Sequence, residues 1–268
     1  QFLWNAYGAQ TDAGYCDFGL YPVDNEFFIG GWGTTYMDTS AAYRDPSAWY
    51  HFLVRVDTTD STANDRVLFY ANGELVTSVT KTNPAEDFVF PYNQAVVHAF
   101  GEAYLLGGTR VFNGYMAEVH IIDGTALTPS SFGEFNETTG QWVPIEYEGN
   151  TASYGTNGGY YKFAAGALGT DSSGKGNNYT AVNLADSDVT LDTPTNNFPT
   201  LNPIAGDDTA AFTQGNTVGT LVPVNGAVMS NFALPSTGKW YCEFKFDSAP
   251  GYAVIGVGRM GMRGWTSS

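Results

Sequence analysis

Basic residues are scarce in this sequence. Its 268 residues include 11 Lys and Arg against 27 Asp and Glu, which gives a formal net charge of −16. A surface of that sign repels phosphate backbones, and no cluster of Lys and Arg interrupts it. We therefore expect no nucleic-acid partner. The same charge also argues against association with a membrane surface.

Long apolar runs and helical patterns are missing as well. No stretch approaches the roughly 20 apolar residues that cross a bilayer, so membrane insertion is not expected. Apolar residues at helical spacing are nearly absent, and the exception, Pro129–Phe135, is too short for more than one or two turns. The sequence therefore predicts no long helix.

The sequence also has few cysteines and no catalytic motif. Cys16 and Cys242 lie far apart in the chain, so a disulfide between them is not expected. There is no G-x-S-x-G elbow, Gly-rich phosphate loop or Cys/His nucleophile arrangement, and no catalytic residue is predicted.

The three histidines have no Cys or carboxylate at ligand spacing, and we claim no metal site for them. His120 can pair with Glu118, two residues away, or be an ordinary surface histidine.

Glycine and aromatic residues, in contrast, are abundant: 32 Gly, 18 Phe and 17 Tyr. Short strands joined by turns need this composition. The clearest pattern runs from Trp49 to Gly73. Its first strand alternates, so that Tyr50, Phe52, Val54 and Val56 form one apolar face that should be core. After a polar loop and a second strand, Asn72-Gly73 supplies the residues of a two-residue hairpin turn, and Glu74–Val79 returns as the partner strand.

Similar short apolar runs recur between turn residues, and this spacing predicts an all-β, antiparallel sandwich. A short capped helix is expected at Leu127–Phe132, with Thr128 or Ser130 as the N-cap. The other expected strands are Tyr15–Tyr21, Phe27–Tyr36, Val67–Tyr70, Ala95–Phe100, Tyr104–Leu106 and Tyr115–Ile122.

Composition also predicts three parts in the chain. Residues 1–145 form the first sandwich, and residues 146–206 form an extended bridge rich in Gly, Asn, Thr and Pro, with Asp192–Pro203 outside any sheet. Residues 207–268 begin a second, incomplete sandwich with strands at Gly226–Phe232, Lys239–Phe246 and Tyr252–Val257. We therefore expect the sequence to be a piece of a longer protein.

A resemblance supports the fold. Trp49–His51, Asn72-Gly73, Phe112–Val119 and Leu127–Pro129 stand in the order found in laminin-G-like domains of the concanavalin A-like type. The resemblance covers residues 15–132 and implies an antiparallel β-sandwich or jelly roll.

A second resemblance concerns the later part of the chain. Tyr154–Gly158, Asp171–Gly174, Asp192–Asn197 and Thr200–Pro203 resemble a block in structural proteins of marine bacteriophages of the cyanophage type, and Gly238–Phe244 is similar to the opening strand of SPRY-like sandwiches. This implies a virion protein on the exterior of the particle, at its tail or capsid surface, such as a tail fibre, tail spike or surface fibre used in host attachment.

Exposed aromatic rings are the candidate carbohydrate-binding residues, since a sugar stacks its apolar face on such rings. The candidates are Trp32, Tyr36, Tyr43 and Tyr104; the alternative for each is packing in the core or at its rim. Trp49 and Trp240 are assigned to the core.

Calcium is the one cofactor that the sequence brings into consideration. The loop 57–65 carries Asp57, Asp60, Asn64 and Asp65, which are oxygen ligands of the type that calcium prefers. The loop lacks the spacing of an EF-hand, and a solvated hairpin loop is the alternative. The turn Asp171–Gly174 allows the same two interpretations.

Three functions are compatible with these observations. The first is a non-enzymatic virion protein that binds host surface glycan, as a homo-oligomer such as a trimer whose copies multiply weak binding. The second is an architectural capsid-decoration or tail-junction protein that binds other virion proteins. The third is a glycan-cleaving enzyme, which the sequence disfavours because it lacks the alternating carboxylates of an E-x-D-x-E strand.

Overall fold

The computed structural model describes residues 1–46, 48–102, 111–197, 199–206, 210–220, 228–234, 236–248 and 255–257. The chain divides into two compact units, residues 1–196 and 197–268. The predicted boundaries at residues 145 and 206 stay predictions. No helix among the described residues has the length and apolar character needed to cross a membrane.

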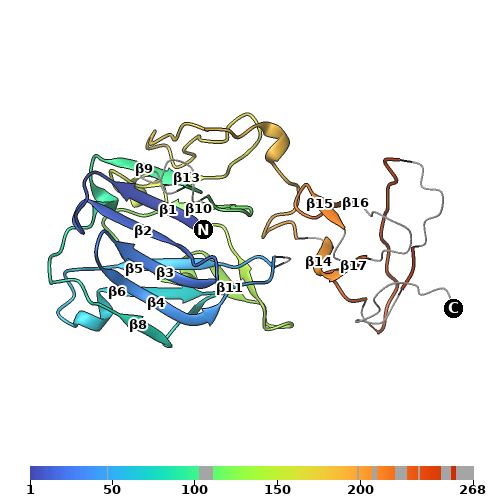
Figure 1. Ribbon diagram of the computed structural model, residues 1–268, viewed down its shortest axis with the longest axis horizontal. Helices are drawn as coiled ribbons and strands as arrows, with labels where there is room; N and C mark the ends of the chain where they lie inside the picture. Colours follow the sequence, from blue (N-terminus) through green and yellow to red (C-terminus); the bar gives the residue numbers. More distant parts are fainter. Residues whose placement is uncertain are drawn as a thin grey trace. The chain divides into compact units, whose positions relative to one another are not determined.

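A six-stranded antiparallel sheet, called here the large sheet, forms one layer of the first unit (Figure 1). Its strand order is β8-β4-β3-β2-β1-β9. The strands are β1 (Phe2–Tyr7), β2 (Tyr15–Leu20), β3 (Glu26–Gly31), β4 (Thr35–Ala42), β8 (Val79–Lys81) and β9 (Val97–Phe100).

A three-stranded sheet, called here the small sheet, forms the second layer. It consists of β5 (Phe52–Val56), β6 (Val67–Ala71) and β7 (Glu74–Leu75) in chain order. Asn72 and Gly73 connect β6 to β7 with φ angles of 48° and 83°, which confirms the predicted tight turn. The strand predicted over Glu74–Val79 is interrupted, because Val79 begins β8 in the large sheet.

The hydrophobic core lies between the two sheets. Phe27 of β3 and Phe69 of β6 stack with ring centroids 3.9 Å apart. Phe52, Val54 and Val56 pack against the same core, as the alternation in β5 predicts. The all-β sandwich fold is therefore confirmed. The remaining buried members of this core are Cys16, Leu20, Ile29, Tyr36, Met37, Val67 and Phe90.

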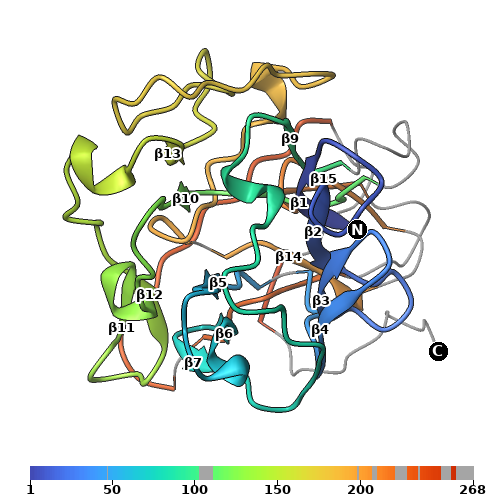
Figure 2. The same ribbon diagram turned by 90° about the vertical axis from the view of Figure 1, so that its left-hand side faces the viewer.

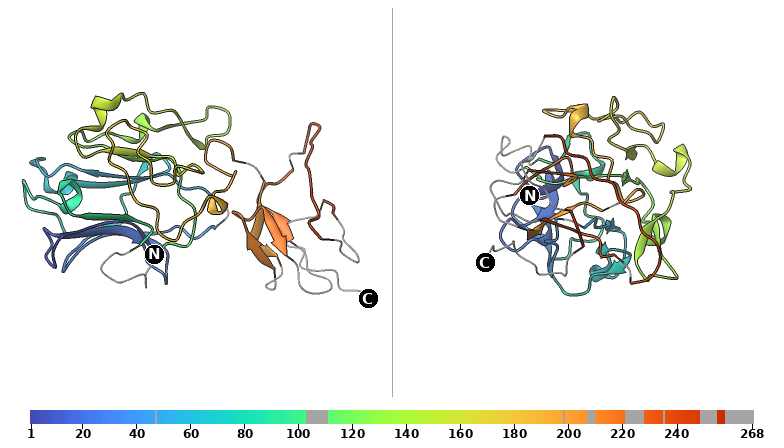
Figure 3. Two further views of the ribbon diagram at one scale, coloured as in Figure 1. Left: turned by 90° about the horizontal axis from the view of Figure 1, so that it is seen from above. Right: turned by 90° about the vertical axis from the view of Figure 1, so that its right-hand side faces the viewer.

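The opposite face of the small sheet is covered too. The hairpin of β11 (Gly133–Phe135) and β12 (Trp142–Pro144) lies against it (Figures 2 and 3). Trp142 packs on His51, with ring centroids 5.6 Å apart, and fills the space beside Gly73. The hairpin therefore covers the small sheet at the end where β5 begins and β6 turns into β7.

The segment between residues 146 and 196, for which composition predicts an extended bridge, packs onto the sandwich. Its strand β13 (Gly159–Tyr161) pairs with β10 (Val119–Ile121). Residues 165–190 run over the edge of the large sheet formed by β1 and β9 (Figures 1 and 2). Trp49, which the sequence assigns to the core, is only half-buried. Its indole N–H donates a hydrogen bond to the Asp192 carboxylate at 3.0 Å.

Short 3-10 helices complete the described elements. Pro129–Ser131 forms the predicted short helix with Thr128 at its N-cap. The Thr128 hydroxyl does not cap the backbone; it bonds to the hydroxyl of Ser130 at 3.0 Å. The helices are η1 (Ala63–Asp65), η2 (Pro91–Asn93), η4 (Pro129–Ser131), η5 (Thr151–Tyr154) and η6 (Asp186–Asp188).

In the second unit, the described strands form two-stranded sheets. β14 (Leu201–Gly206) pairs with β17 (Val228–Ser230), and β15 (Ala211–Thr213) pairs with β16 (Val218–Thr220). β14 begins inside the segment that was expected to lie outside any sheet. Its register is irregular between Leu201 and Gly206, as expected for a strand containing Pro203, which cannot donate a hydrogen bond.

The strand predicted over Lys239–Phe246 is not formed, since residues 236–248 contain no strand. Trp240, assigned to the core, is 59% exposed. Small two-stranded sheets offer too little surface to bury a tryptophan, which explains why this assignment is wrong. Of the predicted strand Tyr252–Val257, the structure describes residues 255–257, which are not in a strand.

Candidate functional site

Trp32 lies in the turn between β3 and β4, at one end of the large sheet. Its side chain is 44% exposed. Below it is the buried ring of Tyr15, with centroids 6.0 Å apart and planes at 86°, and the ring of Tyr7 lies 6.2 Å beyond. The indole of Trp32 is therefore a partly exposed surface that rests on fixed aromatic side chains.

Asp12, in the loop between β1 and β2, holds this turn in place. Its carboxylate accepts hydrogen bonds from the Gly33 N–H at 2.8 Å and from the Thr34 hydroxyl at 2.7 Å. These bonds, the one from Gly33 first, hold the pKa of the Asp12 carboxyl below its usual value. Trp32, Tyr15, Tyr7 and Asp12 together are called the Trp32 platform.

Tyr36 does not belong to this platform, although it follows Trp32 closely in the sequence. It is 4% exposed and points between the sheets, where it packs against Phe90 at 4.9 Å and Phe88 at 6.0 Å. Burial raises the pKa of its hydroxyl. Because the core encloses its ring, the predicted stacking of a sugar on Tyr36 is contradicted.

Tyr43 and Tyr104 are also not brought to the platform. Tyr43 is half-buried and packs edge-on against Phe52 at 4.9 Å. It follows the end of the eight-residue strand β4, whereas Trp32 precedes its start, so the two rings lie at opposite ends of a strand about 25 Å long. Tyr104 lies outside the described residues. Trp32 is therefore the predicted aromatic that the described structure leaves available.

The predicted calcium loop uses its carboxylates for other bonds. Asp57 accepts from the backbone N–H of Thr59 at 3.2 Å and from its hydroxyl at 2.7 Å, and its second oxygen lies 3.6 Å from Arg55. Asp60 accepts from the N–H of Thr62 at 2.8 Å. These are turn-stabilising bonds within the loop itself.

The other two predicted ligands face outward from the same loop. Asn64 accepts through its Oδ1 from Asn83 at 2.7 Å, and the exposed Asp65 lies near Lys81. No three His, Cys, Asp or Glu side chains in the described ranges come together to hold a metal ion. The described loop is a hairpin stabilised by its own hydrogen bonds and by the neighbouring Arg55 and Lys81, and the calcium interpretation stays a prediction.

Two tyrosine–aspartate pairs lie on the outer face of the large sheet. The hydroxyl of Tyr15 donates to Asp17 at 2.6 Å, and that of Tyr21 donates to Asp38 at 2.9 Å. Burial, followed by the bond to Asp38, raises the pKa of Tyr21 to about 12. The sequence analysis missed the first pair, although residues two apart in a strand share a face.

His120 of β10 and Glu118, the residue before this strand, have separate partners. The His120 ring stacks on Tyr160 with centroids 4.2 Å apart, and its Nδ1 bonds to the Tyr154 hydroxyl at 2.9 Å. Burial lowers the pKa of His120 to about 4. Glu118 accepts from the hydroxyl of Tyr160. His120 is thus a half-buried member of an aromatic cluster in the first unit.

The turn Asp171–Gly174 has a structural role. Asp171 is buried and accepts from the backbone N–H groups of Tyr160 at 2.9 Å, Ser173 at 2.8 Å and Asn177 at 3.0 Å. Burial alone would raise the pKa of this carboxyl, but hydrogen bonds from Ser173, Tyr160 and Asn177 hold it below its usual value. The bond that the N–H of Ser173 donates to the Asp171 carboxylate, two positions earlier, confirms the Asx-turn interpretation.

Comparison with known families agrees with this fold. Residues 4–131 match the laminin G model of the concanavalin A-like lectin/glucanases superfamily. The chain therefore carries a concanavalin A-like domain, and the laminin-G-like part of the resemblance is confirmed. No curated protein and no solved structure matches the chain significantly. Because this superfamily includes both lectins and glycosidases, the match suggests carbohydrate binding and does not decide whether the chain cleaves its ligand.

Proposed function

We propose that this chain is a non-enzymatic protein of the bacteriophage virion that binds host surface glycan at the Trp32 platform. The observation that carries the proposal is an indole 44% exposed, supported by the Tyr15 ring and fixed by Asp12 in a concanavalin A-like domain. Rigid aromatic surfaces of this kind bind the apolar face of a pyranose with little loss of conformational freedom.

The virion role rests on the resemblance of the block from Tyr154 to Pro203 to phage structural proteins. In this proposal the chain lies on the particle exterior, as a tail fibre, tail spike or surface fibre, and contacts other virion proteins. A homo-oligomer such as a trimer would present several platforms. Multiple copies raise the effective concentration of a weak site by orders of magnitude.

The pKa values of two carboxyl groups support the non-enzymatic part of this proposal. A glycosidase needs one carboxylic acid whose pKa is raised, so that it can protonate the leaving group. Hydrogen bonds hold the pKa of Asp12 and that of Asp171 below the usual value, so neither of these two carboxyl groups suits that role.

The test is binding of the full chain, displayed in multiple copies, to an array of bacterial surface polysaccharides. We expect Trp32→Ala to weaken binding by at least about tenfold, the loss of about 1.4 kcal/mol that removal of one stacked ring produces. Trp240→Ala is the matched control, because Trp240 is 59% exposed but lies in the second unit.

Two outcomes would contradict the proposal. Retained binding by the Trp32→Ala variant would remove the platform as the glycan site. Cleavage of a bound polysaccharide that disappears in an Asp17→Asn variant would show that the chain is an enzyme.

The architectural role is the second candidate, and one observation favours it. Aliphatic side chains are exposed along the segment before the second unit, and such rows often mark subunit contacts. They are Val182 (66%), Leu184 (57%), Val189 (37%) and Leu191 (79%). Binding to no polysaccharide, together with oligomers that dissociate when Leu191 is changed to Asp, would favour this role.

A further inference from the structure

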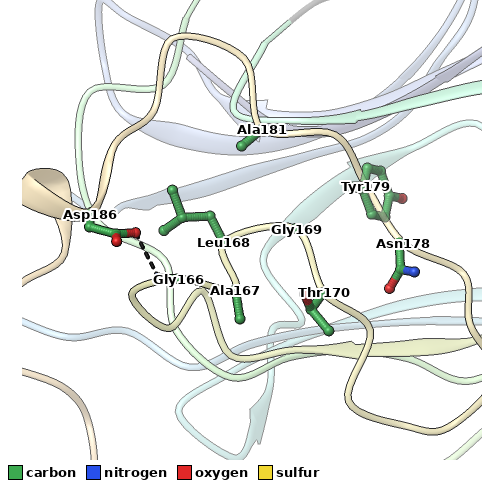
Figure 4. Close-up of a pocket in the computed structure, with 9 residues that line it drawn as sticks. All are labelled: Gly166, Ala167, Leu168, Gly169, Thr170, Asn178, Tyr179, Ala181 and Asp186. Carbon is green, nitrogen blue, oxygen red and sulfur yellow. Dashed lines mark hydrogen bonds between the residues drawn. The ribbon is translucent and has the colours of Figure 1, made fainter.

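A pocket of about 460 Å³ opens in the segment that follows β13 (Figure 4). It lies between residues 166–170 on one side and residues 178–186 on the other. Its volume is within the range of small-molecule sites. The two family resemblances and the proposed function assign no role to this pocket.

One part of the pocket is apolar and rigid. Leu168 and Tyr179 line it. The Tyr179 ring packs on Phe100 at 4.6 Å, and its hydroxyl accepts a hydrogen bond from the indole N–H of Trp4 at 3.2 Å. The tyrosine is therefore held from below by the sandwich and presents an apolar surface to the pocket.

The rim of the pocket is polar. One carboxylate oxygen of Asp186 accepts a hydrogen bond from the Gly166 N–H at 2.7 Å (Figure 4). The side-chain amide oxygen of Asn178 accepts one from the backbone N–H of Asp171 at 2.8 Å. The second oxygen of Asp186, the amide NH₂ of Asn178 and the Thr170 hydroxyl have no partner among the described residues. The rim thus offers an acceptor, a donor and a hydroxyl.

Backbone hydrogen bonds fix the walls of the pocket. The N–H of Tyr179 donates to the carbonyl of Gly169 at 2.8 Å, and the N–H of Thr170 donates to that of Ala167 at 3.0 Å. Only glycine fits at position 169, since an added Cβ would lie 2.0 Å from the backbone carbonyl oxygen of Tyr179. Binding would therefore require little ordering of the loop.

Charge narrows the class of ligand. The lining includes Asp186 and no Lys, Arg or His, in a chain of net charge −16. Phosphates, uronates and other anions are disfavoured at such a site. An apolar surface beside a carboxylate, an amide and a hydroxyl suits a neutral sugar, whose hydroxyl groups donate and accept hydrogen bonds.

We propose that this pocket binds a single neutral hexopyranose unit, as a carbohydrate site separate from the Trp32 platform. The proposal does not depend on the platform, because no residue is shared between the two. A ligand of this size is expected to bind in the millimolar range.

The test is titration of the ¹⁵N-labelled full chain with methyl glucoside, methyl galactoside, methyl mannoside and, as a charged comparison, glucuronate. We expect at least one neutral glycoside to shift the amide resonances of Gly166, Gly169 and Thr170, and glucuronate to bind at least about tenfold more weakly.

Ala181→Trp should weaken glycoside binding by at least about tenfold, because the indole fills the pocket without removing a hydrogen bond. Ala126→Trp, at an exposed loop position outside the pocket, is the control and should bind as the wild type does.

The proposal is overturned if none of the three neutral glycosides shifts these resonances, if Ala181→Trp binds as the wild type does, or if glucuronate binds equally well. The Trp32→Ala variant should keep this binding, so failure of one site is distinguishable from failure of the other.

Discussion

Arg66 shows how single buried residues organise the loops of the first unit. It is 8% exposed, and its guanidinium donates to the carbonyl oxygens of Asp60 at 2.8 Å and Pro84 at 3.0 Å and to Glu86 at 3.1 Å. A planar group with five donors can hold several chain segments at once. The loop that sequence reasoning considered for calcium is therefore anchored by an arginine.

At this scale the sequence was a partial guide to the site. Trp32 and Tyr36 look alike as candidates, since both are aromatic residues near glycine. The first lies in a turn and is exposed, whereas the second is the second residue of β4 and points into the core. Which side of a strand faces the core depends on the partner sheet, and composition alone does not contain that information.

His120 gives a pH-dependent prediction. Its pKa is lowered from 6.5 to about 4, chiefly by burial, with the charges of His51 and Lys162 adding to the effect. Between those values the unfolded chain binds a proton that the folded chain does not. The free energy of unfolding should therefore fall as the pH decreases from about 6.5 to about 4, by up to about 3 kcal/mol from this residue.

The measurement is urea unfolding of the wild type and of His120→Phe at several pH values. Phenylalanine keeps a ring against Tyr160 but cannot be protonated, so the variant should lose less stability on acidification than the wild type. Titrating groups that do not interact with His120 are present in both proteins and cancel in the comparison. Equal losses in the two proteins would show that His120 does not have a depressed pKa.

At the scale of elements, strands in which polar and apolar residues alternate were easiest to predict. The β5–β6 hairpin and its Asn-Gly turn follow from alternation and turn chemistry. β1 was missed, because its residues Phe2, Trp4, Asn5 and Ala6 are all buried and give no polar–apolar alternation. The run Phe27–Tyr36 predicts one strand, whereas the structure has β3 and β4 with a turn between them, because the turn contains Trp32, an aromatic residue of strand character.

The contact between Gly73 and Trp142 joins two of these elements and can be tested with a matched pair of variants. Gly73 has φ +83°, and an added Cβ would lie 2.2 Å from the Trp142 ring. Gly124 has the same φ, with nothing within 4 Å of an added Cβ. We expect Gly124→Ala to cost about 1 kcal/mol of backbone strain and Gly73→Ala to cost about 2 kcal/mol more, because the tryptophan must move.

Denaturant unfolding of the first unit measures both variants. If the two substitutions cost the same, the β11–β12 hairpin does not rest on the Asn-Gly turn, and the covering of the small sheet described above would be wrong.

On the scale of the whole molecule, the fold class followed from sequence, but the packing of residues 146–196 did not. A segment rich in Gly, Asn and Thr looks like a linker. Here its side chains form long-range bonds, as between Trp4 and Tyr179 and between Trp49 and Asp192. Such contacts between residues far apart in the chain leave no local pattern that a single sequence could reveal.

This packing predicts the behaviour of two truncated chains. Residues 1–196 should unfold cooperatively, since they contain every contact of the first compact unit. Residues 1–145 would lose β13, the partner of β10, and the Tyr161 and Tyr179 rings that lie 5.4 and 4.6 Å from Phe100. Exposing buried aromatic surface of this kind costs several kcal/mol, which is a large part of the stability of a domain. We therefore expect the shorter chain to bind a hydrophobic dye and to melt at least about 10 °C lower. Equal melting temperatures would instead support a domain boundary at residue 145, with residues 146–196 as an accessory segment whose pocket could not be a stable binding site.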